Sequence, residues 1–138
     1  MNHNPANPLH LILASASPRR RELLQQVGVA FNVVVAAVNE SVLPGESPAA
    51  YVLRVARDKA LSVLAREGDA LPVLGADTAV VLGDRILGKP DSRADAIAML
   101  QDLSGQTHEV YSAVVLAAAA GRVLDCLNIT RVTFAQLD

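Results

Sequence analysis

Cysteine, aromatic residues and lysine are all scarce in this chain. Its 138 residues include one cysteine, Cys126, two tyrosines, two phenylalanines and no tryptophan. A single cysteine excludes an internal disulfide framework and a zinc site built from several thiolates. A core with so few aromatic residues must be built from valine, leucine and alanine. Because 51% of the residues are hydrophobic, we expect one folded domain rather than a disordered chain.

Charge and long apolar runs are also limited. The net charge is −2 and no long basic run occurs, which argues against a polynucleotide partner because such binding needs many phosphate contacts. The apolar run at residues 110–120 is too short to span a membrane. Residues 1–8 lack the charged start and apolar centre of a signal peptide. We therefore expect a cytoplasmic protein with a disordered leader at 1–8, one domain at 9–138, and no nucleic-acid or membrane partner.

Hydrophobic patterns predict strands that alternate with helices. Each predicted helix starts at a serine suited to the N-cap position, Ser17, Ser47 or Ser92, and proline follows the first two. Asp95 predicts an acidic variant of the capping box. The alternation favours an α/β fold, a mixed twisted sheet flanked by helices. The expected strands are 9–13, 31–38, 71–82, 85–87, 109–118 and 123–134, and the expected helices are 18–27, 48–66 and 93–103.

The end of the sequence is unusual for such a fold. The strand at 123–134 has the pattern of a central strand, and only four residues follow it. We interpret the chain as C-terminally truncated.

Three arginines fill the first turn of the first predicted helix, directly after Pro18. Helix N-termini carry free N–H groups and partial positive charge, so Arg19, Arg20 and Arg21 are badly placed for helix stability. A bound anion would resolve the conflict, with Ser15 and Ser17 as additional hydroxyl donors. A solvated basic turn held by tertiary packing explains the pattern equally well.

Asp77 interrupts an otherwise apolar stretch at residues 73–81. A carboxylate in such a strand needs a partner, a metal ion or a proton. Gly75 and Ala76 leave room for a neighbouring group. The alternative is an aspartate at a strand end that binds its own turn. We favour a functional role.

The chain has only two lysines, Lys59 and Lys89, and both stand at informative positions. Lys59 projects from the edge of the buried face of its helix, where it either snorkels to solvent or points into a cleft. Lys89 sits at the rigid corner Gly88-Lys89-Pro90, from which it could reach a phosphate. Glu40, beside a loop, is ordinary on its own. His108, Asp125 and Cys126 are interpreted as structural.

Two carboxylates (Glu40 and Asp77), two lysines and an arginine turn together suit one kind of chemistry. Carboxylates can hold a divalent ion or orient water, and cations neutralise phosphate charge. This set favours metal-assisted attack of water on a phosphoanhydride. The sequence has no Gly-x-x-x-x-Gly-Lys-Ser/Thr loop, so a P-loop nucleotidase is not expected.

Six motifs follow one another in a specific order. They are Leu13-Ala14-Ser15-Ala16-Ser17-Pro18-Arg19-Arg20-Arg21-Glu22-Leu23-Leu24, Gly45-Glu46-Ser47-Pro48, Ala56-Arg57-Asp58-Lys59-Ala60, Gly75-Ala76-Asp77-Thr78, Gly88-Lys89-Pro90 and Leu103-Ser104-Gly105-Gln106-Thr107-His108. From Leu9 onward the chain closely resembles the Maf family of nucleotide pyrophosphatases.

The resemblance implies a house-cleaning enzyme that hydrolyses nucleoside triphosphates to monophosphate and pyrophosphate with Mg²⁺ or Mn²⁺. It implies phosphate binding by the Ser15–Arg20 turn, including Ser17 and Arg19. Glu40 and Asp77 would serve metal binding and water activation, with Asp77 as general base, and Lys59 and Lys89 would neutralise phosphate charge. The motif forms resemble the branch that prefers dTTP and UTP, including modified pyrimidines.

The family is also associated with inhibition of septum formation, and its fold has a cleft between two lobes, as in ITPase-like proteins. Members are often dimeric, so a homodimer is expected. Family members continue well past residue 134 with a motif that supplies a glutamine to the site. This chain lacks it, so weak or absent turnover is expected. The alternatives are a non-catalytic nucleotide-binding regulator of division and an interaction domain with surface charges only.

Overall fold

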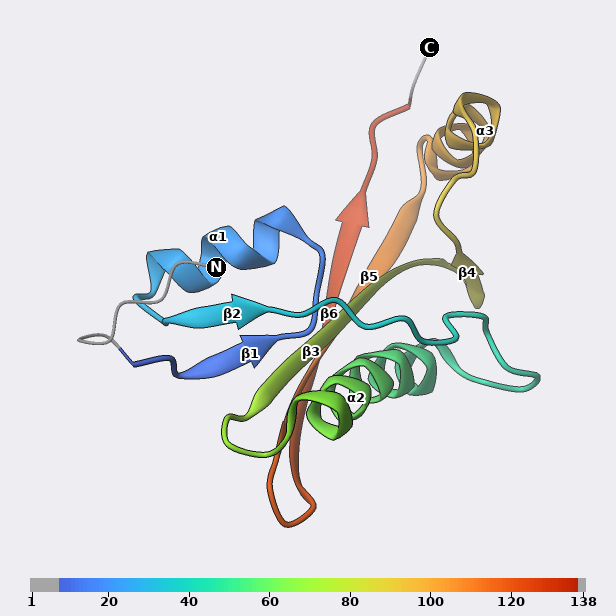
Figure 1. Ribbon diagram of the computed structural model, residues 1–138. Coiled ribbons are helices and arrows are strands. Elements are labelled where there is room, and N and C mark those ends of the chain that lie inside the picture. Colours follow the sequence, from blue (N-terminus) through green and yellow to red (C-terminus); the bar gives the residue numbers. More distant parts are fainter. Residues whose placement is uncertain (1–7, 137–138) are drawn as a thin grey trace.

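The computed structural model describes residues 8–136, so nearly all of the expected leader at 1–8 lies outside the described residues. The elements in these residues alternate much as the hydrophobic pattern predicts (Figure 1). They are β1 (Leu11–Leu13), α1 (Pro18–Gln26), β2 (Phe31–Val33), α2 (Pro48–Glu67), β3 (Val73–Leu82), β4 (Arg85–Leu87), α3 (Arg93–Leu103), β5 (Thr107–Ala118) and β6 (Arg122–Thr133).

One mixed sheet organises the molecule. Its strand order is β2-β1-β3-β5-β6, with β4 paired to β3. The pairs β2–β1 and β1–β3 are parallel, whereas β3–β5, β5–β6 and β3–β4 are antiparallel. The prediction of a mixed α/β fold is confirmed. None of the helices among residues 8–136 is long and apolar enough to cross a membrane.

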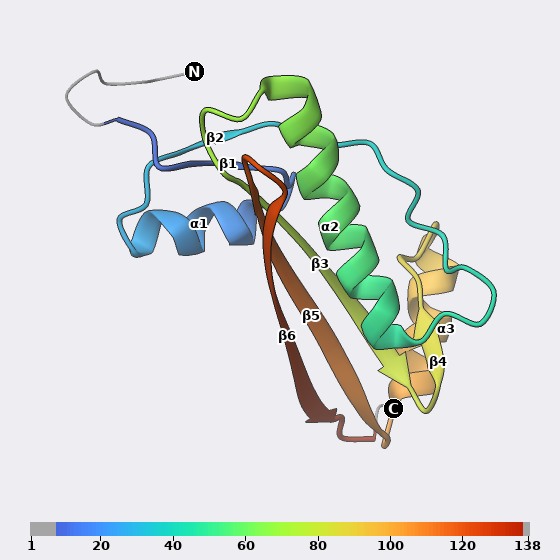
Figure 2. The same ribbon diagram turned by 90° about the horizontal axis from the view of Figure 1, so that it is seen from below.

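The core lies between α2 and one face of the sheet (Figure 2). The helix approaches β3 very closely at Gly75, where an added Cβ atom would lie 2.3 Å from the carbonyl oxygen of Ala56 and 2.9 Å from the nitrogen of Ala60. Glycine is therefore the residue that lets helix and strand meet here. The fully buried residues of α2 are Val52, Val55, Ala56, Ala60 and Val63.

The three predicted caps are present, and one detail differs. Ser17, Ser47 and Ser92 each accept a hydrogen bond from the N–H three residues later, at 3.4, 3.2 and 3.1 Å respectively. The predicted capping box at Asp95 is wrong. Its carboxylate accepts the N–H of Asp91, one residue before the cap, instead of the N–H of the cap itself.

Most predicted strand bounds agree with the structure to within two residues, and two strands differ more substantially. The second strand ends at Val33 rather than at residue 38, because its partner β1 ends at Leu13, opposite Val33, where the chain leaves the sheet to form α1. Beyond that point β1 offers the chain no further ladder partner. The last strand is not central among the described elements: β6 forms the edge of the sheet, and Leu124 is 70% exposed. The apolar residues of this strand, on which the prediction of a central position depended, therefore do not by themselves indicate burial.

Helix α1 lies on the side of the sheet opposite α2 (Figure 2). None of its residues is buried, and Leu23 and Val27 of its predicted apolar face are largely exposed. The helix ends at Gln26, and Gly28, the predicted stop signal, follows two residues later with a φ of 77°. Tertiary packing within residues 8–136 therefore contributes little to this helix, and its position depends mainly on its N-terminal contacts.

Candidate functional site

The loop between β1 and α1 is organised by the buried hydroxyl of Ser15. Its Oγ accepts hydrogen bonds from the N–H of Ser17 and from Nη1 of Arg20, both at 3.2 Å. The side chain of Ser17 in turn caps the helix. This local network bends the chain so that the N-terminus of α1, which carries no acidic residue in its first turn, faces inward with its partial positive charge.

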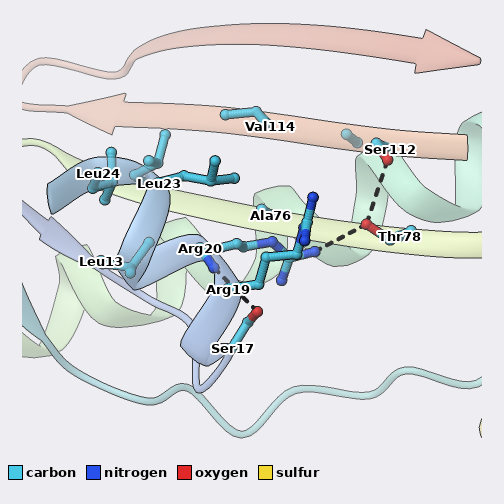
Figure 3. A pocket seen from close by; sticks show the side chains of 12 residues that line it. Leu13, Ser17, Arg19, Arg20, Leu23, Leu24, Ala76, Thr78, Ser112 and Val114 are labelled. Atoms are coloured by element: carbon cyan, nitrogen blue, oxygen red, sulfur yellow. Dashed lines mark hydrogen bonds between the residues drawn. The ribbon is translucent and has the colours of Figure 1, made fainter. Parts of the chain in front are cut away.

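Arg20 extends from this turn toward β3. Its Nη2 donates to Oγ1 of Thr78 at 3.0 Å, and the Thr78 and Ser112 hydroxyl oxygens lie 3.4 Å apart (Figure 3). Desolvation by burial lowers the pKa of Arg20, and the charge of Asp77 opposes that shift. The guanidinium remains charged, and hydroxyl acceptors do not neutralise it. Among residues 8–136 it forms no ion pair that an incoming anion would have to break.

Asp77 lies inside β3, opposite Ala113 of β5, rather than at the strand end that the alternative interpretation required. Only 12% of its side chain is exposed. Burial is the main cause that raises the pKa of Asp77, and the nearby charge of Lys59 partly opposes the rise. Its Oδ2 atom is buried and has no hydrogen-bond partner among the described residues. A buried carboxylate oxygen of this kind is a candidate base or metal ligand.

Lys59 connects the two carboxylates. Its Nζ lies 3.3 Å from Oε1 of Glu40 and 3.7 Å from Oδ1 of Asp77, and it donates to the carbonyl oxygen of Ala76 at 3.4 Å. Only 13% of the side chain is exposed. The lysine thus does not snorkel to bulk solvent, and it places a positive charge between Glu40 and Asp77.

Two neighbouring cavities are lined by most of the residues that the sequence predicts for the site. One of about 290 Å³ is lined by Ser15, Ser17 and Arg20 of the turn before and at the start of α1, and by Glu40, Lys59 and Lys89. The second, of about 390 Å³, shares Glu40 and Lys89 and is also bordered by Asp77. Seven of the eight predicted site residues therefore border these two adjoining spaces. They are Ser15, Ser17, Arg20, Glu40, Lys59, Asp77 and Lys89.

Arg19 is the predicted residue that lies apart. It lines a third cavity of about 520 Å³, between α1 and the sheet, together with Leu23, Leu24 and Val114 (Figure 3). Ser17 and Arg20 border this cavity as well, so it adjoins the others.

Sequence reasoning missed three polar residues near this centre: Tyr51, Thr78 and Ser112. Thr78 is the last residue of the motif Gly75-Ala76-Asp77-Thr78, and strand alternation turns its side chain to the face opposite that of Asp77, toward Arg20. Ser112 is the register partner of Thr78. Tyr51 borders the Asp77 cavity and donates to the carbonyl of Glu40 at 2.6 Å. These roles depend on contacts between distant parts of the chain, so no local pattern marks them.

The residues interpreted as structural lie outside both adjoining cavities. His108 is buried, and its ring meets that of Phe134 edge-on at 4.8 Å. Its Nδ1 has no hydrogen-bond partner within residues 8–136. Cys126 and Asp125 lie on the exposed edge strand β6 and are not buried in the core.

A divalent ion would fit this centre only in part through protein ligands. No group of three or more His, Cys, Asp or Glu side chains among residues 8–136 could hold a metal alone. Mg²⁺, however, is commonly bound by one or two carboxylates together with substrate phosphates. Glu40 and the unpartnered Oδ2 of Asp77 supply such a pair beside a cationic turn.

The fold and site thus define an α/β protein in which a cationic turn at the start of a helix lies next to two carboxylates. The family model described as Maf-like protein matches residues 10–138, and the chain belongs to this family. The chain is 50% identical over 127 residues to the dTTP/UTP pyrophosphatase of Escherichia coli (strain K12). It is 55% identical over 130 residues to the dTTP/UTP pyrophosphatase of Anaeromyxobacter dehalogenans. Each match covers 92% of this chain and 64% of the relative, so the chain spans less than two thirds of these relatives.

Solved structures share the fold at low sequence identity. A Mycobacterium abscessus protein described as a nucleoside-triphosphatase / dITP/XTP pyrophosphatase superposes with a TM-score of 0.58 at 18% identity, over 91% of this chain and 74% of that one. The Ham1 protein of Staphylococcus aureus gives a TM-score of 0.55 at 12% identity, over 88% and 70%. The similarity to these ITPase-like structures supports the fold assignment alone.

Proposed function

We propose that this chain is a nucleoside triphosphate pyrophosphatase that converts dTTP and UTP to the monophosphate and pyrophosphate with the help of Mg²⁺ or Mn²⁺. The observation that carries the proposal is the cavity that brings Ser15, Ser17 and Arg20 together with Glu40, Lys59 and Lys89. The cationic and hydroxyl side chains can bind the oxygens of a polyphosphate, and the carboxylates can orient and deprotonate the attacking water. The names of the relatives in Escherichia coli and Anaeromyxobacter support the pyrimidine preference.

The proposed reaction is the attack of water on the α-phosphorus. A new bond forms between the water oxygen and that phosphorus, the bond from the α-phosphorus to the bridging oxygen breaks, and pyrophosphate leaves. Asp77 takes the proton from the water, and its elevated pKa makes it a better base than an ordinary aspartate. Arg20, Lys59 and Lys89 neutralise the charge that develops on the phosphate oxygens.

Glu40 and Asp77 are the residues that would hold the divalent ion. When bound, such an ion would supply Lewis-acid polarisation of the phosphate oxygens. The positive charge of Lys59 offsets the repulsion between the two carboxylates, because its ammonium group lies within ion-pair distance of both. By resemblance to the family, the proposal extends to modified pyrimidine nucleotides, a cytoplasmic location, a homodimer and an influence on septum formation.

A nucleotide panel tests the proposal. Pyrophosphate release would be measured with dTTP, UTP, dCTP, dATP and 7-methyl-GTP in Mg²⁺ or Mn²⁺, and binding by calorimetry in the same buffers. We expect dTTP and UTP to be preferred in both measurements. Asp77→Asn should abolish release and retain binding, whereas Asp84→Asn in the exposed β3–β4 turn should change neither.

The binding measurement separates the alternatives. Binding of dTTP with slow release that falls further in Asp77→Asn would support the enzyme, whereas binding with no release that depends on Asp77 would favour a non-catalytic nucleotide-binding regulator. Absence of both binding and release would contradict the proposed function and favour an interaction domain.

A further inference from the structure

Glu40 stands on a segment that forms no regular structure. Residues 34–47, between β2 and α2, belong to neither a helix nor a strand, and Glu40 itself is exposed. Its carboxylate nevertheless lies 3.3 Å from Lys59 at the edge of the cavity. Since no backbone ladder fixes this segment, side chains must hold Glu40 in place.

Two side chains of α2 bind three consecutive carbonyl oxygens around Glu40. Tyr51 donates its hydroxyl to the carbonyl of Glu40 itself at 2.6 Å. Arg54 donates from Nη1 to the carbonyl of Asn39 at 3.1 Å and from Nη2 to that of Ser41 at 2.7 Å. The backbone of Glu40 is thus held at its own carbonyl and on both sides.

Arg54 is itself fixed by the same segment. Glu46 binds it through two bonds, from Nε to Oε2 at 2.6 Å and from Nη2 to Oε1 at 3.1 Å, a charge-assisted bidentate arrangement. Oε1 of Glu46 also accepts the N–H of Leu43 at 3.1 Å. The guanidinium carbon lies 5.7 Å from the centre of the Tyr51 ring. Only 21% of the Arg54 side chain and 9% of the Glu46 side chain are exposed, so this network is substantially shielded from water.

We propose that Tyr51 and Arg54 are positioning residues that hold Glu40 at the cavity in the geometry that binding of the divalent ion and water requires. This inference rests on the proposed function, because only that function gives Glu40 a divalent ion to bind. Holding three carbonyls removes the backbone freedom that the segment would otherwise lose only on binding. The phosphate-binding turn at Ser15–Arg20 lies on a different element and should be little affected.

The two residues can be tested with conservative variants. Tyr51→Phe keeps the ring and removes one hydroxyl, and Arg54→Lys keeps the charge but loses the planar fork. Arg66→Ala serves as the matched control, because Arg66 also extends from α2 to a carbonyl of this segment, that of Val35, five residues before Glu40. Mn²⁺ affinity would be measured by calorimetry with a non-hydrolysable dTTP analogue bound, and amide hydrogen exchange at residues 39–43 would be followed in parallel.

We expect Tyr51→Phe and Arg54→Lys each to weaken Mn²⁺ affinity about tenfold, as is usual for residues that orient a metal ligand. Exchange at residues 39–43 should accelerate, and affinity for the analogue without metal should change less than about twofold. Arg66→Ala should leave all three quantities unchanged. In a Glu40→Gln background, Tyr51→Phe should have almost no further effect on Mn²⁺ affinity, because both substitutions act through one carboxylate.

The outcomes against the proposal differ from one another. Unchanged exchange at residues 39–43 would overturn the positioning role. So would additive effects of Glu40→Gln and Tyr51→Phe, which would mark Tyr51 as merely structural. If the unsubstituted chain bound neither the analogue nor Mn²⁺, the proposed function itself would fail and the positioning role with it.

Discussion

The Nζ atom of Lys59 lies 3.7 Å from Oδ1 of Asp77, a contact that joins the middle of α2 to the middle of β3. It is possible only because the helix and the strand approach closely at Gly75, two residues before Asp77. The same approach that closes the core therefore sets the distance between the two charges. Stability and site geometry share one structural cause.

Gly75→Ala should strongly destabilise the protein. The new Cβ atom would stand 2.3 Å from a backbone oxygen and 2.9 Å from a backbone nitrogen of α2, and backbone atoms cannot move aside as a flexible side chain can. We expect the free energy of unfolding to fall by about 2–3 kcal/mol, the upper part of the range for overpacked cores. Urea denaturation followed by circular dichroism would measure it.

Gly88→Ala is the matched control for this change. An added Cβ atom there meets nothing within 4 Å, and its φ is not in the left-handed region. Its unfolding free energy should stay within about 0.5 kcal/mol of the unsubstituted value. Equal losses at both positions would show that close approach at Gly75 is not the cause.

Asp77→Asn should stabilise the fold at neutral pH. Folding raises the pKa of this carboxyl chiefly through burial, so above its usual value of 3.8 the ionised form costs stability in the native state. Removing the charge should raise the free energy of unfolding at pH 7, because the native state no longer has to hold an ionised group in a buried position. The gain should shrink as the pH falls toward 4, where the native carboxyl is increasingly protonated. Thermal unfolding at several pH values would follow it, and a gain that grew toward low pH would contradict the assigned sign.

Sequence rules that depend only on neighbouring residues, such as the capping preference, predicted where the helices begin. Ser17 and Pro18 start α1 where the capping preference indicates. The position of Lys59 at the edge of the buried helix face left snorkelling and a cleft both open, and the structure decides between them by burying its side chain. The length of β2 could not be predicted, because it ends where its partner β1 ends, at Leu13. The edge position of β6 likewise depends on which strands surround it and not on its own residues.

The candidate site shows the same division. Charged residues out of place in their own element, such as Asp77 in a strand, can be recognised from one sequence. Tyr51 and Thr78 could not, because a tyrosine in a helix and a threonine in a strand are ordinary residues. Their importance arises from acceptors 11 residues away at Glu40 and donors 58 residues away at Arg20, which only the folded chain brings together.

Arg20→Lys should weaken dTTP binding. The guanidinium donates to Ser15 and Thr78 through two different nitrogens, and a lysine cannot reproduce this fork. We expect the dissociation constant, measured by calorimetry, to rise about tenfold or more, since a hydrogen bond to a charged group contributes about 1.5–3 kcal/mol. Arg21→Lys on the exposed side of the same turn should change it less than about twofold. Equal effects of the two substitutions would indicate a diffuse electrostatic contribution rather than a positioned arginine.

The titration of Asp77 should move in opposite directions in two variants of the metal-free protein. Lys59 lowers the pKa of Asp77 and Glu40 raises it, while burial remains the largest influence. Lys59→Met should therefore raise this pKa further, and Glu40→Gln should lower it toward the usual value. Carbon-13 NMR of the aspartate carboxyl groups would follow both titrations without requiring activity, with Asp77→Asn to assign the signal. Because the two substitutions change the local charge by one unit in opposite senses, a shift in the same direction for both would mean that solvent entry, and not the Lys59 and Glu40 charges, controls the protonation of Asp77.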